Sequence, residues 1–251
     1  MIGITPVQLS AERWADDEDV NDLVVAIVSG QPLARVEALS ARVDINARDH
    51  LDYTPLMQAV RAGRLDVCRK LIDRGADLNA STQTGSNALM LAVLYGHESV
   101  LRLLLSRGAG VDPPTPSGRT ALMTAYNVGS DELAEVLLEA GANVNARSHQ
   151  GVTPMIDVAS APPASPATLR LIRRLSDAGA DINAQDNDGT TALMEAAKSN
   201  SGDTVALLRS LGADVRVRDR WGRDAVAMAR EGNCPDALAA LLAEAPPAPA
   251  K

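Results

Sequence analysis

The residues of this chain that could catalyse reactions or bind metals do not form a recognisable motif. The three histidines, His50, His97 and His149, stand far apart in the sequence. No Walker-type phosphate loop, His-Glu-x-x-His, Gly-x-Ser-x-Gly or paired Cys-x-x-Cys motif occurs. Carboxylates are plentiful, but they recur at equivalent positions such as Asp77 and Asp181, which favours roles in turns and caps. We therefore expect no catalytic residues, no metal site and no cofactor.

The composition indicates which partners this chain does not bind. Lys and Arg number 24 against 32 Asp and Glu, which gives a formal net charge of −8. Nucleic acid and anionic membranes need a basic surface, so neither is expected as the main partner. No apolar run is long enough for a membrane span, and residues 1–20 do not resemble a signal peptide. We predict a cytoplasmic protein, and the excess of Arg over Lys points to GC-rich coding and a bacterial source.

Two short patterns recur along the chain at an interval of 33 residues. The first pattern reads Thr-Pro-Leu-Met-Gln-Ala at 54–59, and related copies follow at 87–92, 120–125, 153–158, 191–196 and 224–229. The second has the form Gly-Ala-Asp-Leu-Asn-Ala and recurs at 75–80, 108–113, 141–146, 179–184 and 212–217. One interval is longer, because residues are inserted before 191–196. Two patterns in step are typical of a repeat protein, in which each unit contacts only its neighbours.

The interval and the first pattern resemble the ankyrin repeat, whose signature is Thr-Pro-Leu-His-x-Ala within 33 residues. The resemblance spans roughly residues 18–243. It implies an all-α fold, an ankyrin-repeat solenoid of helix-turn-helix units with β-hairpin loops. One departure is consistent, because Met usually replaces the His of the signature. The hydrogen bond between that His and the Thr is therefore missing.

The repeats divide the chain into consecutive segments. We predict a flexible lead-in at 1–17, an N-terminal capping repeat at 18–47, five internal repeats at 48–217, a C-terminal capping repeat at 218–243 and a disordered tail at 244–251. The fourth internal repeat carries an insertion near 161–166, between its two helices. The prolines of Pro113-Pro114-Thr115-Pro116 should stiffen or distort the hairpin that they enter.

Each repeat should form a helix, a turn, a second helix and a loop. Thr54 and its equivalents are placed to cap the first helix, and Pro at the next position suits the first turn. Gly63 and its equivalents allow a positive φ between the helices, and Gly75 and its equivalents end the second helix. Cys68 falls at an apolar register and should be buried. Cys234 lies five repeats away, so no disulfide within the chain is expected.

The residues that the repeat does not dictate are the candidates for partner binding. Tyr53, Tyr95 and Trp221 fall at hairpin or first-helix-end positions, which in ankyrin proteins vary between repeats and face partners. Aromatic side chains are enriched at binding hot spots, and Leu94 adds apolar area beside Tyr95. Random scatter is the alternative, because single exposed aromatics are normal, and Tyr126 could equally fill space between helices. The predicted partner-binding residues are His50, Leu51, Tyr53, Leu94, Tyr95, Arg119, Tyr126, Asn127, His149, Arg220, Trp221 and Arg223.

Four arginines flank Trp221 in the last hairpin: Arg216, Arg218, Arg220 and Arg223. One interpretation is a cationic surface for an acidic partner, since Arg can bind a carboxylate through two hydrogen bonds. The other is a solvated hairpin that is rich in Arg. The sequence favours neither interpretation.

Resemblance to the ankyrin family implies a non-enzymatic module whose partner is another protein, bound on the face of hairpins and inner helices. We predict that the chain binds and inhibits, or scaffolds, one specific partner. For a bacterial chain this includes the neutralising, immunity-type partner of a toxin or enzyme. The alternatives are a secreted effector that targets a host protein, an enzyme with a site built onto the solenoid, and a purely structural stack. A neighbouring toxin gene or a secretion assay would separate the first two roles.

Overall fold

The computed structural model describes residues 18–113, 115–160 and 165–243. The predicted lead-in and tail, and most of the insertion near 161–166, lie outside the described residues. The chain divides into two compact units, Met1–Pro116 (unit 1) and Ser117–Lys251 (unit 2), and each is described by itself. The prediction of one continuous stack stays a prediction.

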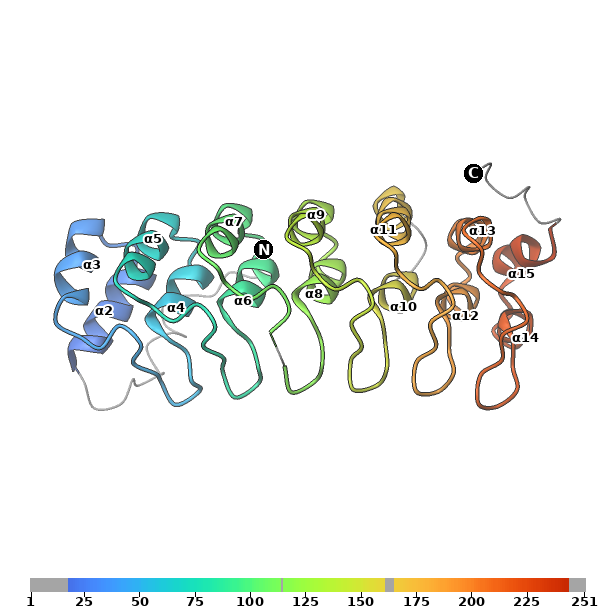
Figure 1. Ribbon diagram of the computed structural model, residues 1–251, viewed down its shortest axis with the longest axis horizontal. Helices are drawn as coiled ribbons and strands as arrows, with labels where there is room; N and C mark the ends of the chain where they lie inside the picture. The colour runs from blue at the N-terminus through green and yellow to red at the C-terminus, as the bar shows by residue number, and fades with distance from the viewer. Residues whose placement is uncertain (1–17, 114, 161–164, 244–251) are drawn as a thin grey trace. The chain divides into compact units, whose positions relative to one another are not determined.

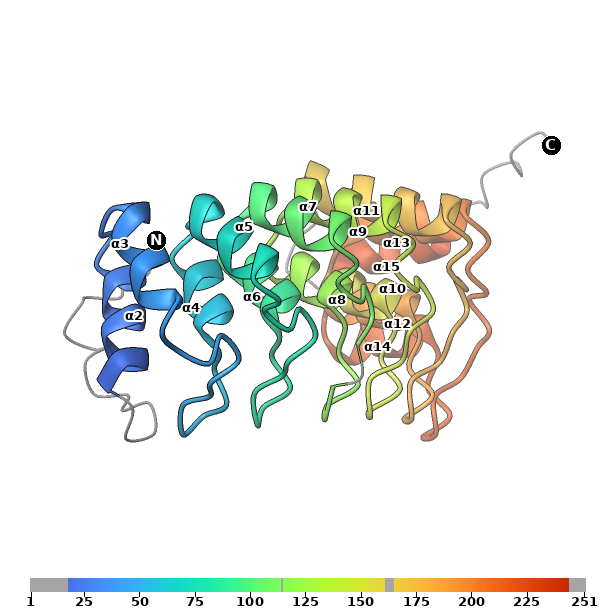
Figure 2. The same cartoon turned by 60° about the vertical axis from the view of Figure 1, so that its left-hand side comes forward.

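Unit 1 consists of helix pairs joined by loops (Figure 1). Its first helices are α2 (Glu18–Val28), α4 (Pro55–Arg61) and α6 (Ala88–Leu94), and its second helices are α3 (Leu33–Ser40), α5 (Leu65–Asp73) and α7 (Glu98–Ser106). First helices contact first helices, and second helices contact second helices. The unit therefore has two helical layers, and its hairpin loops extend from the layer of first helices (Figure 2).

Unit 2 repeats this arrangement. Its first helices are α8 (Ala121–Asn127), α10 (Pro154–Ala159), α12 (Ala192–Lys198) and α14 (Ala225–Glu231), and its second helices are α9 (Asp131–Glu139), α11 (Pro166–Asp177), α13 (Gly202–Ser210) and α15 (Pro235–Leu242). The all-α prediction is confirmed. The hairpins contribute no sheet to the described ranges, where Ser81 and Asn87 form an isolated antiparallel bridge.

A side-chain cap starts each first helix from α4 onward. The Oγ1 of Thr54 accepts a hydrogen bond from the N–H of Met57 at 3.3 Å. The equivalent residues make the same bond in the later repeats: Asn87, Thr120, Thr153, Thr191 and Asp224. The predicted threonine cap is thus confirmed. Because the cap satisfies a backbone donor that the helix leaves free, replacing it by Ala typically costs about 0.5–2 kcal/mol.

The chain reverses direction at residues with positive φ. Gly63 has φ of 66° between α4 and α5, and Gly75 has φ of 88° after α5. Asn200 and Asn233 take the register of Gly63 with φ of 52° and 51°. Glycine and asparagine tolerate this conformation better than other residues. The predicted turn positions are confirmed.

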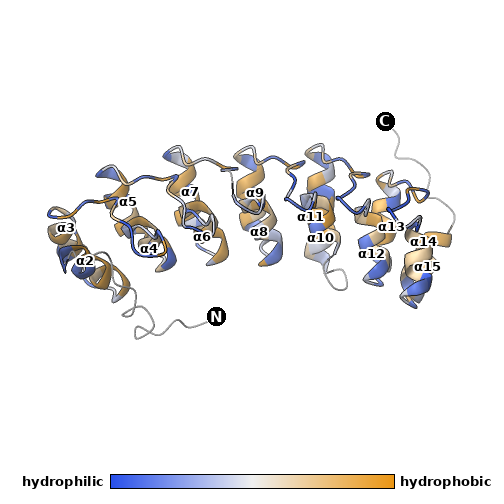
Figure 3. Ribbon diagram, turned by 90° about the horizontal axis from the view of Figure 1, so that it is seen from below, coloured by the Kyte–Doolittle hydropathy of each residue, from blue (hydrophilic) through white to orange (hydrophobic). Residues whose placement is uncertain are grey.

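The core is built from Leu, Met, Val and Ala of the facing helices (Figure 3). Met57, Met123 and Met194, which replace the signature His, are each at most 1% exposed and pack as apolar side chains. Cys68 and Cys234 are buried and free. Among the described residues of unit 1 none of the buried core side chains is aromatic, so Tyr95 and most of Tyr53 are not needed to fill it.

An asparagine after the second helix ties each repeat to the next within a unit. In unit 1, Asn46 donates to the carbonyl of Gly75 at 3.3 Å and accepts from the N–H of Asp77 at 2.7 Å. Asn145 and Asn183 make the same two contacts in unit 2. These bonds fix the start of each loop relative to its neighbour.

Leu104→Ala should destabilise the protein far more than Leu51→Ala. Leu104 is fully buried in α7, so truncation leaves a cavity and should cost about 2–5 kcal/mol. Leu51 is 40% exposed at a hairpin tip, and its truncation should cost under about 0.5 kcal/mol. Denaturant unfolding of both variants measures the difference. Equal losses would show that the packing assigned to these two positions is wrong.

Candidate protein-binding surface

The hairpin tips are closed by a side chain that accepts hydrogen bonds from their own backbone. In unit 1, Oδ1 of the buried Asp49 accepts from the N–H groups of Leu51 and Tyr53, both at 2.8 Å. Asp186 and Asp219 hold two tips of unit 2 in the same way. The sequence analysis missed this role, although the signal is an Asp, Thr or Ser five positions before the cap residue of the first helix. The tips are therefore ordered before any partner arrives.

Four aromatic and basic side chains of unit 1 lie together beside the tip that carries Tyr53. The Cζ of Arg61 lies 5.1 Å from the ring centroid of Tyr53 and 6.0 Å from that of Tyr95. The Tyr95 and His97 rings are stacked, with centroids 6.4 Å apart and an interplanar angle of 13°. Leu94, 52% exposed, precedes Tyr95 in the chain. We call Tyr53, Arg61, Leu94, Tyr95 and His97 the Arg61 cluster.

Local packing explains why these residues meet. Tyr53 is half-buried and packs against Val20 and Val24 of α2. The Nε2 of His97 lies 3.3 Å from the carbonyl oxygen of Arg61. A Cβ at Gly63 would lie only 2.7 Å from Cε1 of His97, so glycine is needed for this close approach.

The charge of Arg61 is not neutralised within the described part of unit 1. Its Nη1 donates to Oε1 of Gln58 at 3.1 Å, and no described carboxylate forms an ion pair with it. Gln58 itself is buried, and its Nε2 has no hydrogen-bond partner there. Cation–π contacts with two rings hold a guanidinium in place without cancelling its charge. The Arg61 cluster thus combines a positioned cation with aromatic and aliphatic area.

Sequence reasoning found Tyr53, Leu94 and Tyr95 but missed Arg61 and His97. Arg61 occupies the same register as Leu94 one repeat earlier, at the end of the first helix. That register was the available signal, because Leu94 had been selected there as an apolar residue at a solvent-facing position. The other two predicted residues of unit 1, His50 and Leu51, are exposed at the neighbouring tip.

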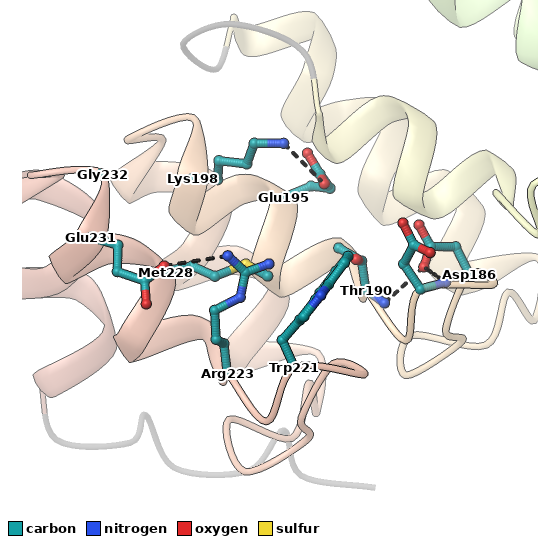
Figure 4. A pocket seen from close by; sticks show the side chains of 10 residues that line it. Asp186, Thr190, Glu195, Lys198, Trp221, Arg223, Met228, Glu231 and Gly232 are labelled. Carbon is teal, nitrogen blue, oxygen red and sulfur yellow. Dashed lines mark hydrogen bonds and ion pairs between the residues drawn. The ribbon is translucent and has the colours of Figure 1, made fainter.

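In unit 2 the structure brings Arg220, Trp221 and Arg223 together. Trp221 is 55% exposed, and the Cζ atoms of Arg220 and Arg223 lie 4.2 and 4.9 Å from its ring centroid. Figure 4 shows Trp221 and Arg223 side by side at a cleft of about 470 Å³. Asp186, Asp188, Glu195, Lys198 and Glu231 also line this cleft.

The arginines of the last hairpin do not form an open cationic surface. Each guanidinium pairs with a carboxylate: Arg216 with Asp214 at 3.1 Å, Arg218 with Asp224 at 3.4 Å, Arg220 with Asp188 at 2.6 Å and Arg223 with Asp219 at 2.8 Å. Because the charges are compensated within the hairpins, these pairs favour the interpretation of a solvated hairpin that is rich in Arg. These pairs position Trp221 instead.

Asp219 illustrates the electrostatics of this hairpin. Burial of its carboxylate opposes ionisation, but hydrogen bonds from Arg223 and from the N–H of Trp221 outweigh that effect and lower its pKa. The guanidinium of Arg216 likewise lowers the pKa of Asp214. Both carboxylates stay ionised at neutral pH and keep the hairpin closed.

The remaining predicted residues of unit 2 have different environments. Arg119 pairs with Asp157, with Nη2 and Oδ2 2.8 Å apart. Asn127 and His149 are exposed. Tyr126 is only 9% exposed, which favours the space-filling interpretation over direct partner contact in this conformation.

Nothing in the described residues resembles a metal centre or a reactive thiol. No group of three or more His, Cys, Asp or Glu side chains there is placed to hold a metal ion. Burial raises the pKa of the Cys68 thiol to about 12, so it does not supply a thiolate nucleophile at neutral pH.

A family model described as ankyrin repeats (3 copies) matches residues 22–115, 56–148 and 164–248. The chain belongs to the ankyrin-repeat family. It is similar to the solved ankyrin-repeat domain of human ASB11, with a TM-score of 0.74 and 24% sequence identity. That match covers 90% of this chain and 99% of the other, and at this identity it shows the fold alone. No curated protein sequence matches the chain at a significant level.

Ankyrin repeats are generally protein–protein interaction modules, and the ankyrin-repeat fold is typically a non-enzymatic scaffold. The resemblance on which the sequence analysis relied is thus confirmed. None of the helices in the described ranges is long and apolar enough to cross a membrane. The Arg61 cluster of unit 1 and the hairpin of unit 2 that carries Trp221 are therefore candidates for binding a protein.

Acidification should release the last hairpin and change the environment of Trp221. The pKa of Asp219 is lower in the folded protein than the ordinary Asp pKa of about 3.9. The ionised carboxylate therefore stabilises the hairpin fully above about pH 3.9, and this stabilisation is lost as the pH falls through the pKa of the folded state. Trp14 is the other tryptophan of the chain, and replacing it by Phe leaves Trp221 as the single tryptophan emitter. In this variant the Trp221 emission should stay constant from pH 7 to about 4 and change below that. Asp219→Asn should shift the emission already at pH 7. A main transition well above pH 5, or one that Asp219→Asn leaves unaltered, would contradict this role.

Proposed function

We propose that this ankyrin-repeat protein is a non-enzymatic module that binds one specific partner protein on the hairpin and first-helix side of unit 1, and that it inhibits or scaffolds that partner. The observation that supports this proposal is the Arg61 cluster. There an arginine without a described carboxylate partner is held against two tyrosine rings, next to the exposed Leu94.

The energetics of binding favour such a surface. Binding costs entropy whenever side chains and loops become ordered, and a surface that is already ordered avoids part of this cost. Here Asp49 closes the tip, His97 stacks on Tyr95, and Arg61 is held by two rings. Tyr and Arg are also the residue types that most often contribute large binding energies.

The chemistry of the Arg61 cluster also indicates what the partner presents there. A guanidinium that lies over two aromatic rings and has no ion-pair partner among the described residues fits a partner carboxylate, and the exposed Leu94 beside Tyr95 fits an apolar side chain next to it. A carboxylate can accept two parallel hydrogen bonds from Arg, which gives directional recognition as well as attraction. We propose an Asp or Glu of the partner as the contact for Arg61.

The finer role within this proposal is that of a neutralising, immunity-type partner of a bacterial toxin or enzyme. The Arg-rich composition supports a bacterial source, and a pre-ordered surface suits a tight complex that blocks its target. A secreted effector is the alternative role, and a secretion assay together with the identity of neighbouring genes separates the two.

Affinity capture from the native host, read by mass spectrometry, tests the proposal. The wild-type chain and a Tyr95→Ala variant serve as paired baits, and the partner is the protein that the wild type enriches and the variant loses. The captured protein's own activity is then assayed with and without the wild-type chain, which separates inhibition from scaffolding. If both baits capture the same proteins in equal amounts, the Arg61 cluster is not the binding surface.

Tyr95→Ala should weaken binding of the captured partner by about 2 kcal/mol or more, roughly thirtyfold, if the ring is a buried anchor. Val128→Ala is the matched control, because Val128 has the same register one repeat later and is 41% exposed in unit 2. Titration calorimetry gives both affinities, and a thermal melt of each variant checks the fold.

Arg61→Glu should weaken binding more than Arg61→Gln, because the reversal adds repulsion of the proposed partner carboxylate to the loss of attraction. The difference should shrink as salt concentration rises, since exposed charges are screened. Identical affinities for Arg61→Glu and wild type would exclude a carboxylate contact at this position. Affinity measurements at low and high salt provide the comparison.

A further inference from the structure

Two of the residues that line a cleft of about 330 Å³ in unit 2 each have a buried polar atom with no hydrogen-bond partner in the described chain. The atoms are the hydroxyl oxygen of Tyr126 and Oδ1 of Asp131. The cleft is formed by the end of α8, the turn after it, the starts of α9 and α11, and the end of α10. Its volume lies at the lower end of the range for ligand pockets.

Tyr126 is not required by the repeat. The residues at its register in the other repeats are small and apolar: Val60, Val93, Ala159 and Ala197. Tyr126 is buried, with only 9% of its surface exposed, and its hydroxyl has no hydrogen-bond partner among the described residues. Burial, reinforced by the charge of Glu135, raises its pKa, so the phenol stays protonated. A buried hydroxyl without a partner is unfavourable unless something else satisfies it.

Asp131 offers one carboxylate oxygen to the same cleft. Its other oxygen, Oδ2, accepts from Nη2 and Nε of Arg170 at 2.5 and 3.1 Å. Asp131 is the first residue of α9, where the helix dipole favours a negative charge. The bond with Arg170 therefore holds the carboxylate in place, while Oδ1 has no partner among the described residues.

The lining selects among ligand chemistries. Asp131 and Asp157 both line the cleft, and no Lys, Arg or His does so within the described ranges, so the lining offers acceptors and disfavours an anion. Each carboxylate already pairs with an arginine, Asp131 with Arg170 and Asp157 with Arg119, so the cleft selects by acceptor geometry rather than by net charge. A guanidinium binds best to both oxygens of a carboxylate, but Arg170 already holds one oxygen of Asp131. An ammonium group carries three N–H donors that point in different directions, so it can bind one oxygen from each of several side chains. Oδ1 of Asp131 and the hydroxyl oxygen of Tyr126 can each accept one of them.

We propose that this cleft binds a primary ammonium group at the end of an unbranched alkyl chain, the group that a lysine side chain carries. Oδ1 of Asp131 supplies one acceptor and the hydroxyl oxygen of Tyr126 supplies the second. Asn127 also lines the cleft and is exposed, so it can contact the alkyl chain of the ligand. The inference does not depend on the proposed function, because small amines test it directly and the Arg61 cluster belongs to the other unit.

The direct test is a titration of the full chain followed by nuclear magnetic resonance of its backbone amides. The probe is Nα-acetyl-lysine methylamide, and the matched probes are the norleucine and arginine derivatives with the same end groups. The lysine derivative should shift the amides of residues 126–131 in a saturable way, and at least tenfold more tightly than either matched probe. Absence of a saturable shift would overturn the proposal. Equally tight binding of the norleucine derivative would also overturn it, because the ammonium group would then contribute nothing.

A free diamine distinguishes the source of the ammonium group. If the lysine derivative binds at least as tightly as 1,4-diaminobutane, the site is one for a protein side chain. If the diamine binds more tightly, the site is one for a small amine. Both results support ammonium recognition, and a failure of both probes contradicts it.

Asp131→Asn and Tyr126→Phe should each reduce affinity for the lysine derivative at least tenfold. Glu132→Gln is the charge-matched control, because Glu132 is exposed beside Asp131 and does not line the cleft. Tyr126→Phe should also leave the thermal midpoint unchanged or raise it, since the lost hydroxyl has no partner in the free protein. A clearly lowered midpoint together with unchanged amine affinity would show that the hydroxyl serves only the fold.

Discussion

The structure depends on the fact that a pair of short helices cannot bury its apolar face alone. Each pair gains a core only when the next pair packs against it, so first helices contact first helices and second helices contact second helices within each unit. The buried Leu, Met and Ala residues at repeated positions follow from this constraint. The asparagine that bridges one loop to the next repeat completes the interface with hydrogen bonds.

This core leaves the loops and the ends of the first helices free for recognition. Within unit 1 the layers are filled by aliphatic residues, and Tyr53, Arg61 and Tyr95 gather at the surface instead. Asp49 holds the tip in a fixed conformation, which lowers the entropy lost on binding. In unit 2 the same kind of tip positions Trp221, but with arginines whose charges are already paired. The two units therefore offer surfaces of different chemistry on one repeated scaffold.

Residues that act within one repeat were predictable from the sequence, because local physics fixes them. The threonine cap at Thr54 and the glycine turn at Gly63 depend only on positions a few residues away. Contacts between repeats were not predictable. Arg61 lies in α4 and meets Tyr95 at the end of α6, and no pattern specifies how two variable side chains will point. The pairing of Arg220 with Asp188 also joins neighbouring hairpins, which is why the sequence alone could not decide between a cationic surface and a solvated hairpin.

Hydrogen exchange of the full chain with and without its captured partner tests the central claim most directly. The claim is that the hairpin and first-helix side of unit 1 is the binding surface, because that is where the aliphatic core leaves recognition residues free. Bound partner should slow exchange in peptides that cover residues 50–62 and 93–98, and leave the exposed faces of α5 and α7 unchanged. Slowed exchange confined to α5 and α7 would contradict the account.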